Sequence, residues 1–205
     1  MGFDNVQNIQ IFGAGGHAKV VIQTARAAGY VPVAVFDDNI ETHGKMLCGV
    51  PIVGHLSEAL KSMPTVIAIG NNQVRKRCCE SMSLPWVTII HPTAVVDPTA
   101  TIGEGTVVFA GAVIQADSII GRHAIINTSA SVDHDSCLSD YVHVAPGCRV
   151  TGEVHVGEGV LLGAGTSIKP RMKIGEWSVV GAGGVVVADI PSHVTAMGVP
   201  ARVKP

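Results

Sequence analysis

The chain has 205 residues, a formal net charge of −2 and a pI near 6.5, so it lacks the basic surface that nucleic-acid binding requires. Charged residues make up only 15% of the chain and aromatic residues 4%, while Val and Ile greatly outnumber Leu. β-Branched residues favour strands, so we expect a mostly sheet protein whose narrow interior is filled by medium-sized aliphatic side chains.

No stretch approaches 18 uninterrupted apolar residues, so we expect no membrane insertion. The first 16 residues carry an acid and no basic region, which is not the pattern of a signal peptide. Five cysteines form an odd set without a Cys-x-x-Cys motif, which predicts reduced thiols and a cytoplasmic location.

Apolar runs alternate with amphipathic stretches up to residue 85, followed by a junction at 86–93. This order predicts a Rossmann-like βαβαβ unit, a parallel doubly wound half-domain. The expected strands cover 8–12, 31–36 and 65–70, and the expected helices cover 20–29, 56–63 and 73–82.

A glycine turn, Gly13-x-Gly15-x-x-Ala18, follows the first expected strand. Glycines let a phosphate approach the backbone, and the helix N-terminus that follows offers unpaired N–H groups. The match to a dinucleotide fingerprint is imperfect, so a nucleotide site and a merely tight turn both stay open. Asp37 and Asp38 end the second strand, at the edge where such sheets bind ligands.

Residues 94–189 divide into sixteen hexads without an insertion, and a tail covers 190–205. The third position of every hexad is Val, Ile or Leu, from Val96 to Val186. Such a short period predicts a parallel β-helix, with three six-residue sides in each coil of 18 residues. The third position should point inward, and the small first position should turn inward near a corner.

The outer faces of this prism are expected to be apolar, with Val107, Val142, Val160 and Val185 as examples. A lone prism would expose this surface to water, so we predict a homotrimer with clefts between neighbouring prisms.

Residues 18 positions apart lie above one another in such a prism, which identifies candidate sites. His134 stands between two aspartates at a corner, and Gly152 lies one coil below it. A histidine beside a carboxylate is a candidate general base, although a solvated corner residue fits the same pattern. The histidines of the coils do not stack at this spacing, so no catalytic metal is expected. Cys137 lacks a motif that would mark it as a nucleophile.

Ala164 and Ala182 are also 18 residues apart, and Pro146 and Thr128 continue the same column. This bare strip fits either a groove for a long thin ligand or ordinary packing at a corner.

Several segments together carry a family resemblance: IFGAGGHAKVV, FDD, AIGNN, IHPTAVV, INTSASVDHD and MGVPARVKP. With them the chain resembles bacterial nucleotide-sugar N-acetyltransferases of the sialic-acid O-acetyltransferase-like family, which carry hexapeptide repeats. Within that family it is most similar to enzymes that acetylate the 4-amine of a UDP-linked 2-acetamido-4-amino-trideoxyhexose. The resemblance implies a left-handed β-helix, an exception to the right-handed crossover rule.

The resemblance also implies roles for individual residues. It places the uridine nucleotide at Gly15, Gly16, His17, Asp37, Asp38 and Gly70, and acetyl-CoA at His143, Ala164 and Ala182. It assigns the base to His134, with Asp135 where the family often has Glu, the oxyanion donor to Gly152, and an orienting role to Asn127. The implied reaction is direct attack of the sugar amine on the thioester in a ternary complex.

Other functions stay open on the sequence alone. A GDP-linked 4-amino sugar is an alternative acceptor, and sialic acid O-acetylation is an alternative reaction. A non-catalytic β-helical binding protein would leave the nucleotide-like N-terminal unit unexplained, and a dehydrogenase would need a catalytic domain that the chain does not have.

Overall fold

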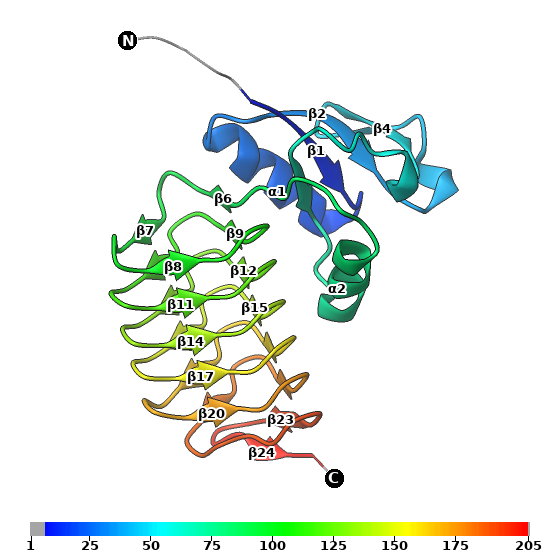
Figure 1. Ribbon diagram of the computed structural model, residues 1–205. Coiled ribbons are helices and arrows are strands. Elements are labelled where there is room, and N and C mark those ends of the chain that lie inside the picture. The colour runs from blue at the N-terminus through cyan, green and yellow to red at the C-terminus, as the bar shows by residue number, and fades with distance from the viewer. Residues whose placement is uncertain (1–6, 205) are drawn as a thin grey trace.

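The computed structural model describes residues 7–204, so the predicted lack of a signal peptide concerns a stretch that lies partly outside the described residues. A small α/β unit stands at one end of a long three-sided β-helix (Figure 1). The α/β unit contains α1 (Gly16–Ala27) and α2 (Asn72–Glu80). Neither it nor any other described segment contains a helix long and apolar enough to cross a membrane.

The N-terminal sheet confirms the predicted Rossmann-like unit. Its strand order is β3-β4-β2-β1-β5, and all pairs are parallel except β3 with β4. The strands are β1 (Asn8–Phe12), β2 (Val31–Phe36), β3 (Met46–Leu47), β4 (Val50–Gly54) and β5 (Thr65–Ile67). β1 and β2 have the predicted bounds, whereas β5 is shorter than expected.

The helix predicted over 56–63 is wrong. Only a single 3-10 turn forms there, at Leu56–Glu58. The buried Gln10 side chain explains the difference, because its amide donates to Leu60 O (2.7 Å) and accepts from Leu60 N (3.0 Å). These backbone groups therefore find their partners in β1 and do not need a helix.

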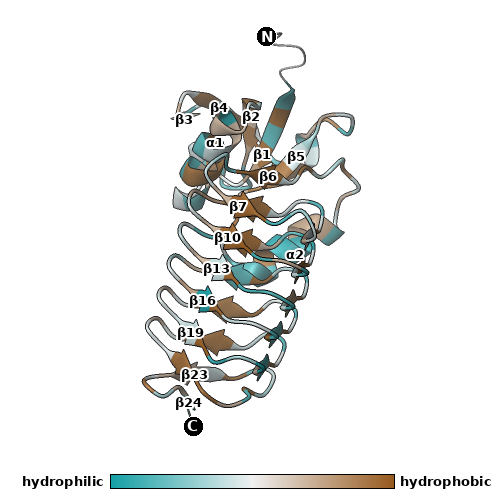
Figure 2. Cartoon of the chain, turned by 90° about the vertical axis from the view of Figure 1, so that its left-hand side faces the viewer, coloured by the Kyte–Doolittle hydropathy of each residue, from teal (hydrophilic) through white to brown (hydrophobic). Residues whose placement is uncertain are grey.

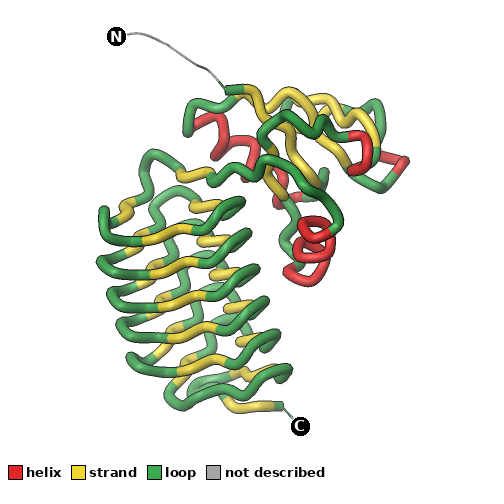
Figure 3. The backbone as a smooth tube through the Cα atoms, in the orientation of Figure 1, coloured by secondary structure: helices red, strands yellow, loops and turns green. Residues whose placement is uncertain are grey.

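From β6 to β22 the β-helix consists of two-residue strands separated by four-residue corners. Figure 3 shows these strands in yellow and the corners in green. Face 1 contains β7 (Val95–Val96), β10 (Val113–Ile114), β13 (Ser131–Val132), β16 (Arg149–Val150), β19 (Ser167–Ile168) and β22 (Val185–Val186). Face 2 contains β8 (Thr101–Ile102), β11 (Ile119–Ile120), β14 (Cys137–Leu138), β17 (His155–Val156) and β20 (Lys173–Ile174). Face 3 contains β6 (Ile89–Ile90), β9 (Val107–Val108), β12 (Ile125–Ile126), β15 (His143–Val144), β18 (Leu161–Leu162), β21 (Val179–Val180), β23 (Thr195–Met197) and β24 (Arg202–Val203).

The hexad register is confirmed. The second residue of each strand from β7 to β22 is the aliphatic third position, and from Val108 onward every one of these is buried. Strands pair in parallel at a spacing of 18 residues, as in Ile125 with His143. Face 1, shown in Figure 2, leads through face 2 to face 3 as the chain descends in Figure 1, which gives a left-handed coil.

Two of the residues predicted on the outer faces are inside. Val142 and Val160 occupy the first hexad position, are fully buried and belong to the core of the prism. The first position turns inward at the corners whether it holds Ala, Ser or Val. These two valines therefore provide no argument for a trimer.

The coils extend beyond residues 94–189. β6 lies in the predicted junction and pairs with β9 at the same 18-residue spacing. β23 lies in the predicted tail and pairs with β21. The N-terminal unit packs on the first coils of face 3, because the outward side chains of Val107 and Ile125 are buried in one cluster with Ile9 and Ile22.

Candidate active site

A cavity of about 430 Å³ lies at the carboxyl edge of the N-terminal sheet. All six residues to which the family resemblance assigns the nucleotide line this cavity. They are Gly15, Gly16, His17, Asp37, Asp38 and Gly70.

The glycine turn places the N-terminus of α1 at this cavity. Gly13 has φ +100°, and a Cβ on it would lie 2.9 Å from Ala68 O, so the turn requires glycine. Gly15 is the N-cap and offers no side chain to the first N–H groups of the helix. A Cβ built on Gly15 or Gly16 has no atom within 4 Å, so the backbone stays open to a ligand. Unpaired N–H groups at a helix N-terminus form a site for an anion such as a phosphate.

Asp37 and Asp38 differ in the hydrogen bonds that their carboxylates already accept. Asp37 accepts from Ala14 N (2.6 Å) and Asn39 N (2.9 Å), so its carboxylate fixes the glycine turn. Asp38 accepts from Leu56 N through Oδ1 (3.2 Å), and its side chain is 67% exposed. Asp38 is therefore the aspartate with an oxygen free for a ligand, and Asp37 shapes the turn.

His17 also meets the β-helix at this cavity. Its ring centroid lies 6.1 Å from that of His143 on face 3. Burial, followed by the positive charge of Arg75, lowers the pKa of both histidines to about 4, so both are neutral at pH 7. The Asn127 amide lies 3.1 Å from His143 Nε2, and its oxygen already accepts from Thr128 N (2.8 Å). The amide nitrogen of Asn127 therefore donates, and His143 Nε2 accepts.

A second group lies at the corner between faces 1 and 2. His134 Nδ1 and Asp135 Oδ2 are 2.8 Å apart, and both side chains are more than half exposed. The hydrogen bond to Asp135 raises the pKa of His134 above its ordinary value, with smaller contributions from Asp133 and Glu153. Because Nδ1 faces the carboxylate, Nε2 is the nitrogen left to take up a proton from a ligand.

Gly152 lies directly beneath His134. A Cβ on Gly152 would come within 2.7 Å of Cε1 and Nε2 of the imidazole, so only glycine admits the ring in this position. The Gly152 carbonyl accepts from Arg171 N (3.1 Å), whereas its N–H has no acceptor among residues 7–204.

The two groups lie on opposite sides of one chain. The cavity lies in the N-terminal unit, which packs on face 3, and His143 is on face 3. His134 stands at the corner between faces 1 and 2, which is the corner opposite face 3 in a triangular prism. Within one chain, Asn127 therefore contacts His143 and not the His134–Asp135 pair.

The corner between faces 3 and 1 carries the predicted bare strip. Thr128, Pro146, Ala164 and Ala182 are all exposed there, one coil apart. Backbone hydrogen bonds tie the coils together, as from Gly165 N to Pro146 O (2.9 Å) and from Gly183 N to Ala164 O (2.8 Å). His143 lies one strand before this corner, on face 3.

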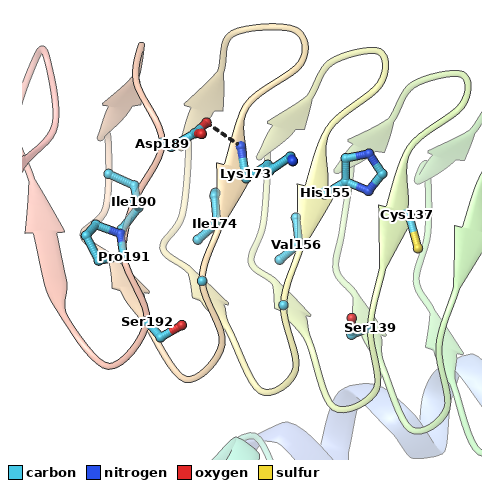
Figure 4. A pocket seen from close by; sticks show the side chains of 12 residues that line it. Cys137, Ser139, His155, Val156, Lys173, Ile174, Asp189, Ile190, Pro191 and Ser192 are labelled. Carbon is cyan, nitrogen blue, oxygen red and sulfur yellow. Dashed lines mark hydrogen bonds between the residues drawn. The ribbon is translucent and has the colours of Figure 1, made fainter.

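Face 2 has a hollow of about 650 Å³, lined by Cys137, His155 and Lys173 from successive coils (Figure 4). It includes none of the residues predicted to be catalytic or to bind a ligand. Among residues 7–204, no three or more His, Cys, Asp or Glu side chains are grouped so that they could share a metal ion.

Comparisons with known proteins place the chain in a family. Residues 8–82 match the family model described as the PglD N-terminal domain. The chain is 31% identical over 211 residues to GDP-perosamine N-acetyltransferase of Escherichia coli O157:H7, covering 94% of each protein. It is 45% identical over 110 residues to UDP-N-acetylbacillosamine N-acetyltransferase of Bacillus subtilis strain 168, and this match spans only about half of each protein (50% and 51%).

A solved structure gives the same result. A crystal structure of perosamine N-acetyltransferase from Caulobacter crescentus, a His-to-Asn variant in complex with CoA and GDP-perosamine, matches with a TM-score of 0.90. It is 42% identical, and the match covers 98% of each chain. A left-handed β-helix built from hexads, with a small α/β unit at its N-terminal end, places the chain among the hexapeptide-repeat acyltransferases. Within that class, the chain belongs to the family of nucleotide-sugar N-acetyltransferases.

Proposed function

We propose that this protein transfers the acetyl group of acetyl-CoA to the 4-amine of a UDP-linked 4-amino-trideoxy sugar. The observation that carries the proposal is the pair of His134 and Asp135 seated on Gly152, at a corner of a β-helix whose N-terminal unit holds a nucleotide-sized cavity. Membership of the nucleotide-sugar N-acetyltransferase family supports the reaction class.

The cavity holds the nucleotide. Its diphosphate lies at the N-terminus of α1, where the N–H groups of Gly15 and Gly16 are open and a negative charge is favoured. Asp38 has a carboxylate oxygen free to accept from ribose or base. The sugar then extends past His17 and Gly70 towards His143.

The acetyl transfer needs one base and one oxyanion donor. The amine nitrogen attacks the thioester carbon, the new C–N bond forms and the C–S bond breaks. His134 Nε2 takes a proton from the amine and returns one to the departing CoA sulfur, while Asp135 holds the opposite ring nitrogen. The N–H of Gly152 stabilises the oxyanion. Direct transfer requires no acetylated enzyme.

Two neighbouring chains complete one site. Because His134 and the nucleotide cavity lie on opposite sides of a prism, the cavity of one chain must meet the His134 corner of another. Cyclic symmetry gives every chain both roles, and three prisms around one axis satisfy it. We therefore propose a homotrimer in which acetyl-CoA lies in the cleft, along Ala164 and Ala182 of one chain and beside His143.

By function, the chain divides into a nucleotide-sugar-binding unit (1–85), a junction (86–93), the acyltransferase β-helix (94–189) and a tail (190–205). The strands β6 and β23 extend the coils beyond the hexads on either side. Acetyl-CoA is a metabolite of the cytoplasm, so the proposed reaction takes place there.

A GDP-linked 4-amino sugar is the second candidate acceptor, because two of the matches that cover nearly the whole chain are to GDP-perosamine enzymes. The test is thiol release from acetyl-CoA with UDP- and GDP-linked 4-amino sugars, each beside its 4-hydroxy counterpart and beside a CMP-linked sialic acid. We expect release with an amine and none with the matching hydroxyl. Release with hydroxyl acceptors alone would replace N-acetylation by O-acetylation, and no release with any acceptor would contradict the proposal.

A further inference from the structure

Arg75 is buried without an acidic partner. It lies on α2 with 1% of its surface exposed, and none of the ion pairs among residues 7–204 includes it. A buried cation is costly unless its charge and its hydrogen bonds are compensated. Since it is almost completely covered within one chain, a neighbouring chain cannot reach it to supply a carboxylate.

Backbone carbonyls of both structural units bind its guanidinium. Nε donates to His123 O (2.8 Å) and Nη2 to Tyr141 O (2.8 Å), at the corner between faces 2 and 3. Nη1 donates to Ile69 O (2.9 Å) and Gly70 O (3.3 Å), just after β5. One side chain thus joins the edge of the nucleotide cavity to two successive coils of the β-helix.

Asn72 extends this contact by one coil. Its Oδ1 accepts from Arg75 Nη2 (2.8 Å), and its Nδ2 donates to Gly159 O (3.0 Å). The carbonyls of His123, Tyr141 and Gly159 come from residues 18 positions apart, so they lie above one another along the corner. All three residues have positive φ. These contacts provide an acceptor for each N–H of the guanidinium, but all the acceptors are neutral, so they do not neutralise its positive charge.

Gly70 connects this charge to the cavity. Its carbonyl accepts from Arg75 Nη1 (3.3 Å), and a Cβ built on Gly70 would lie 3.9 Å from His17 Cγ. Burial lowers the pKa of Arg75 to about 10, which leaves the side chain charged at pH 7. Both histidines are neutral at that pH, so neither of them adds to the positive charge that Arg75 places behind Gly70.

We propose that Arg75 is a positioning residue for a nucleoside diphosphate: it fixes the cavity to the β-helix and holds a buried positive charge that the diphosphate offsets. This inference rests on the proposed function, in which the cavity binds the nucleotide sugar. Arg75 does not touch the ligand; its charge acts across Gly70 in a medium of low polarity, where charges interact more strongly than in water.

A purely structural cross-link would need the hydrogen bonds of Arg75 but not its charge. Arg75→Lys keeps the charge and loses the planar fork, whereas Arg75→Met keeps much of the volume and loses the charge. Arg26→Met is the matched control, because Arg26 is an exposed cation in the last turn of α1.

The experiment is calorimetric titration of each variant with UDP and GDP and with the corresponding nucleosides, beside melting curves. We expect Arg75→Met to weaken binding of the diphosphate by at least about tenfold and binding of the nucleoside by less than about threefold. Arg75→Lys and Arg26→Met should keep diphosphate affinity within about threefold of the unchanged protein, even if the lysine variant melts earlier.

A second readout needs no ligand. NMR titration of the imidazoles should show the pKa of His143 rising in Arg75→Met and staying low in Arg75→Lys. Equal weakening of diphosphate and nucleoside, or an unchanged His143 pKa in Arg75→Met, would overturn the inference and leave the proposed function intact. If Arg75→Met does not fold, Arg75→Lys provides the test. A loss of diphosphate affinity above tenfold in Arg75→Lys would overturn the inference. Binding of neither diphosphate by the unchanged protein would overturn the proposed function together with this inference.

Discussion

The imidazole of His134 rests on the bare backbone of Gly152, with 2.7 Å between its Nε2 and the position of a Cβ on that glycine. Gly152→Ala therefore must displace the ring from its seat. We expect kcat to fall by about a hundredfold or more, because the base and the oxyanion donor lose their alignment together. The melting temperature and acetyl-CoA binding serve as controls. A variant with normal turnover would show that the contact has no catalytic role.

The hydrogen bond between His134 and Asp135 predicts a pH profile. A general base must be neutral to accept a proton. Because Asp135 raises the pKa of His134 above 6.5, we expect activity to rise with pH, with a midpoint above pH 6.5. Asp135→Asn should move this rise to lower pH and also reduce the maximal kcat. Profiles of kcat/KM for both proteins test this, and an unshifted profile would contradict it.

Removal of the base itself gives a larger effect. His134→Ala should lower kcat by roughly 10²- to 10⁴-fold and leave acetyl-CoA binding nearly unchanged. His155→Ala is a matched control, because His155 is an exposed histidine on face 2 that has no role in the proposed site. Comparable loss in both variants would count against the assignment.

Two partly buried, neutral histidines make the fold sensitive to acid. The pKa values of His17 and His143 fall from 6.5 to about 4 in the folded chain, so the unfolded chain binds more protons between these values. Stability is therefore full above about pH 6.5 and declines as pH falls towards 4, by up to about 1.4 kcal/mol per pH unit for each histidine. Urea titrations from pH 7 to 4.5 measure this decline. It should become shallower in His143→Gln and stay unchanged in His155→Gln.

A site shared between chains can be tested by mixing two inactive variants. His134→Ala lacks the base, and Gly16→Asp places a negative charge where the diphosphate should lie. If the site combines one corner with the cavity of a neighbour, random trimers from equal amounts should regain about a quarter of the sites. Co-expression and a thiol-release assay measure this. No recovery in mixed trimers that form normally would mean that each chain builds its own site.

The six-residue period allowed the β-helix to be predicted, because every hexad contains the same two features. Each hexad places an aliphatic side chain inside and a turn at a corner, so the strands from β7 to β22 follow from the sequence. The 18-residue spacing also predicted that Gly152 lies beneath His134 and that Ala164 lies above Ala182. The helix predicted at 56–63 was wrong because a distant side chain bonds to the backbone there. The Gln10 amide hydrogen-bonds to the N–H and carbonyl of Leu60, which would otherwise have bonded within a helix.

Contacts between the two units had no such repeating signal. Arg75 stands among basic residues in α2 and looks like part of a solvated helix. The spacing of Asn72, Arg75 and Cys79, all buried on one helix face, was the available hint. Their partners are backbone carbonyls of the coils, which no side-chain pattern reveals. The separate duties of Asp37 and Asp38 likewise depend on which backbone N–H groups the fold brings near them.

In the proposed function, His134 catalyses transfer of the acetyl group from acetyl-CoA to a sugar amine. The most direct measurement follows CoA thiol release and loss of the primary amine together, in the unchanged protein and in His134→Ala, with UDP- and GDP-linked 4-amino sugars. We expect equal amounts of thiol released and amine consumed, and we expect both rates to collapse in His134→Ala. Thiol release without amine loss, or turnover in His134→Ala close to that of the unchanged protein, would contradict the proposed function.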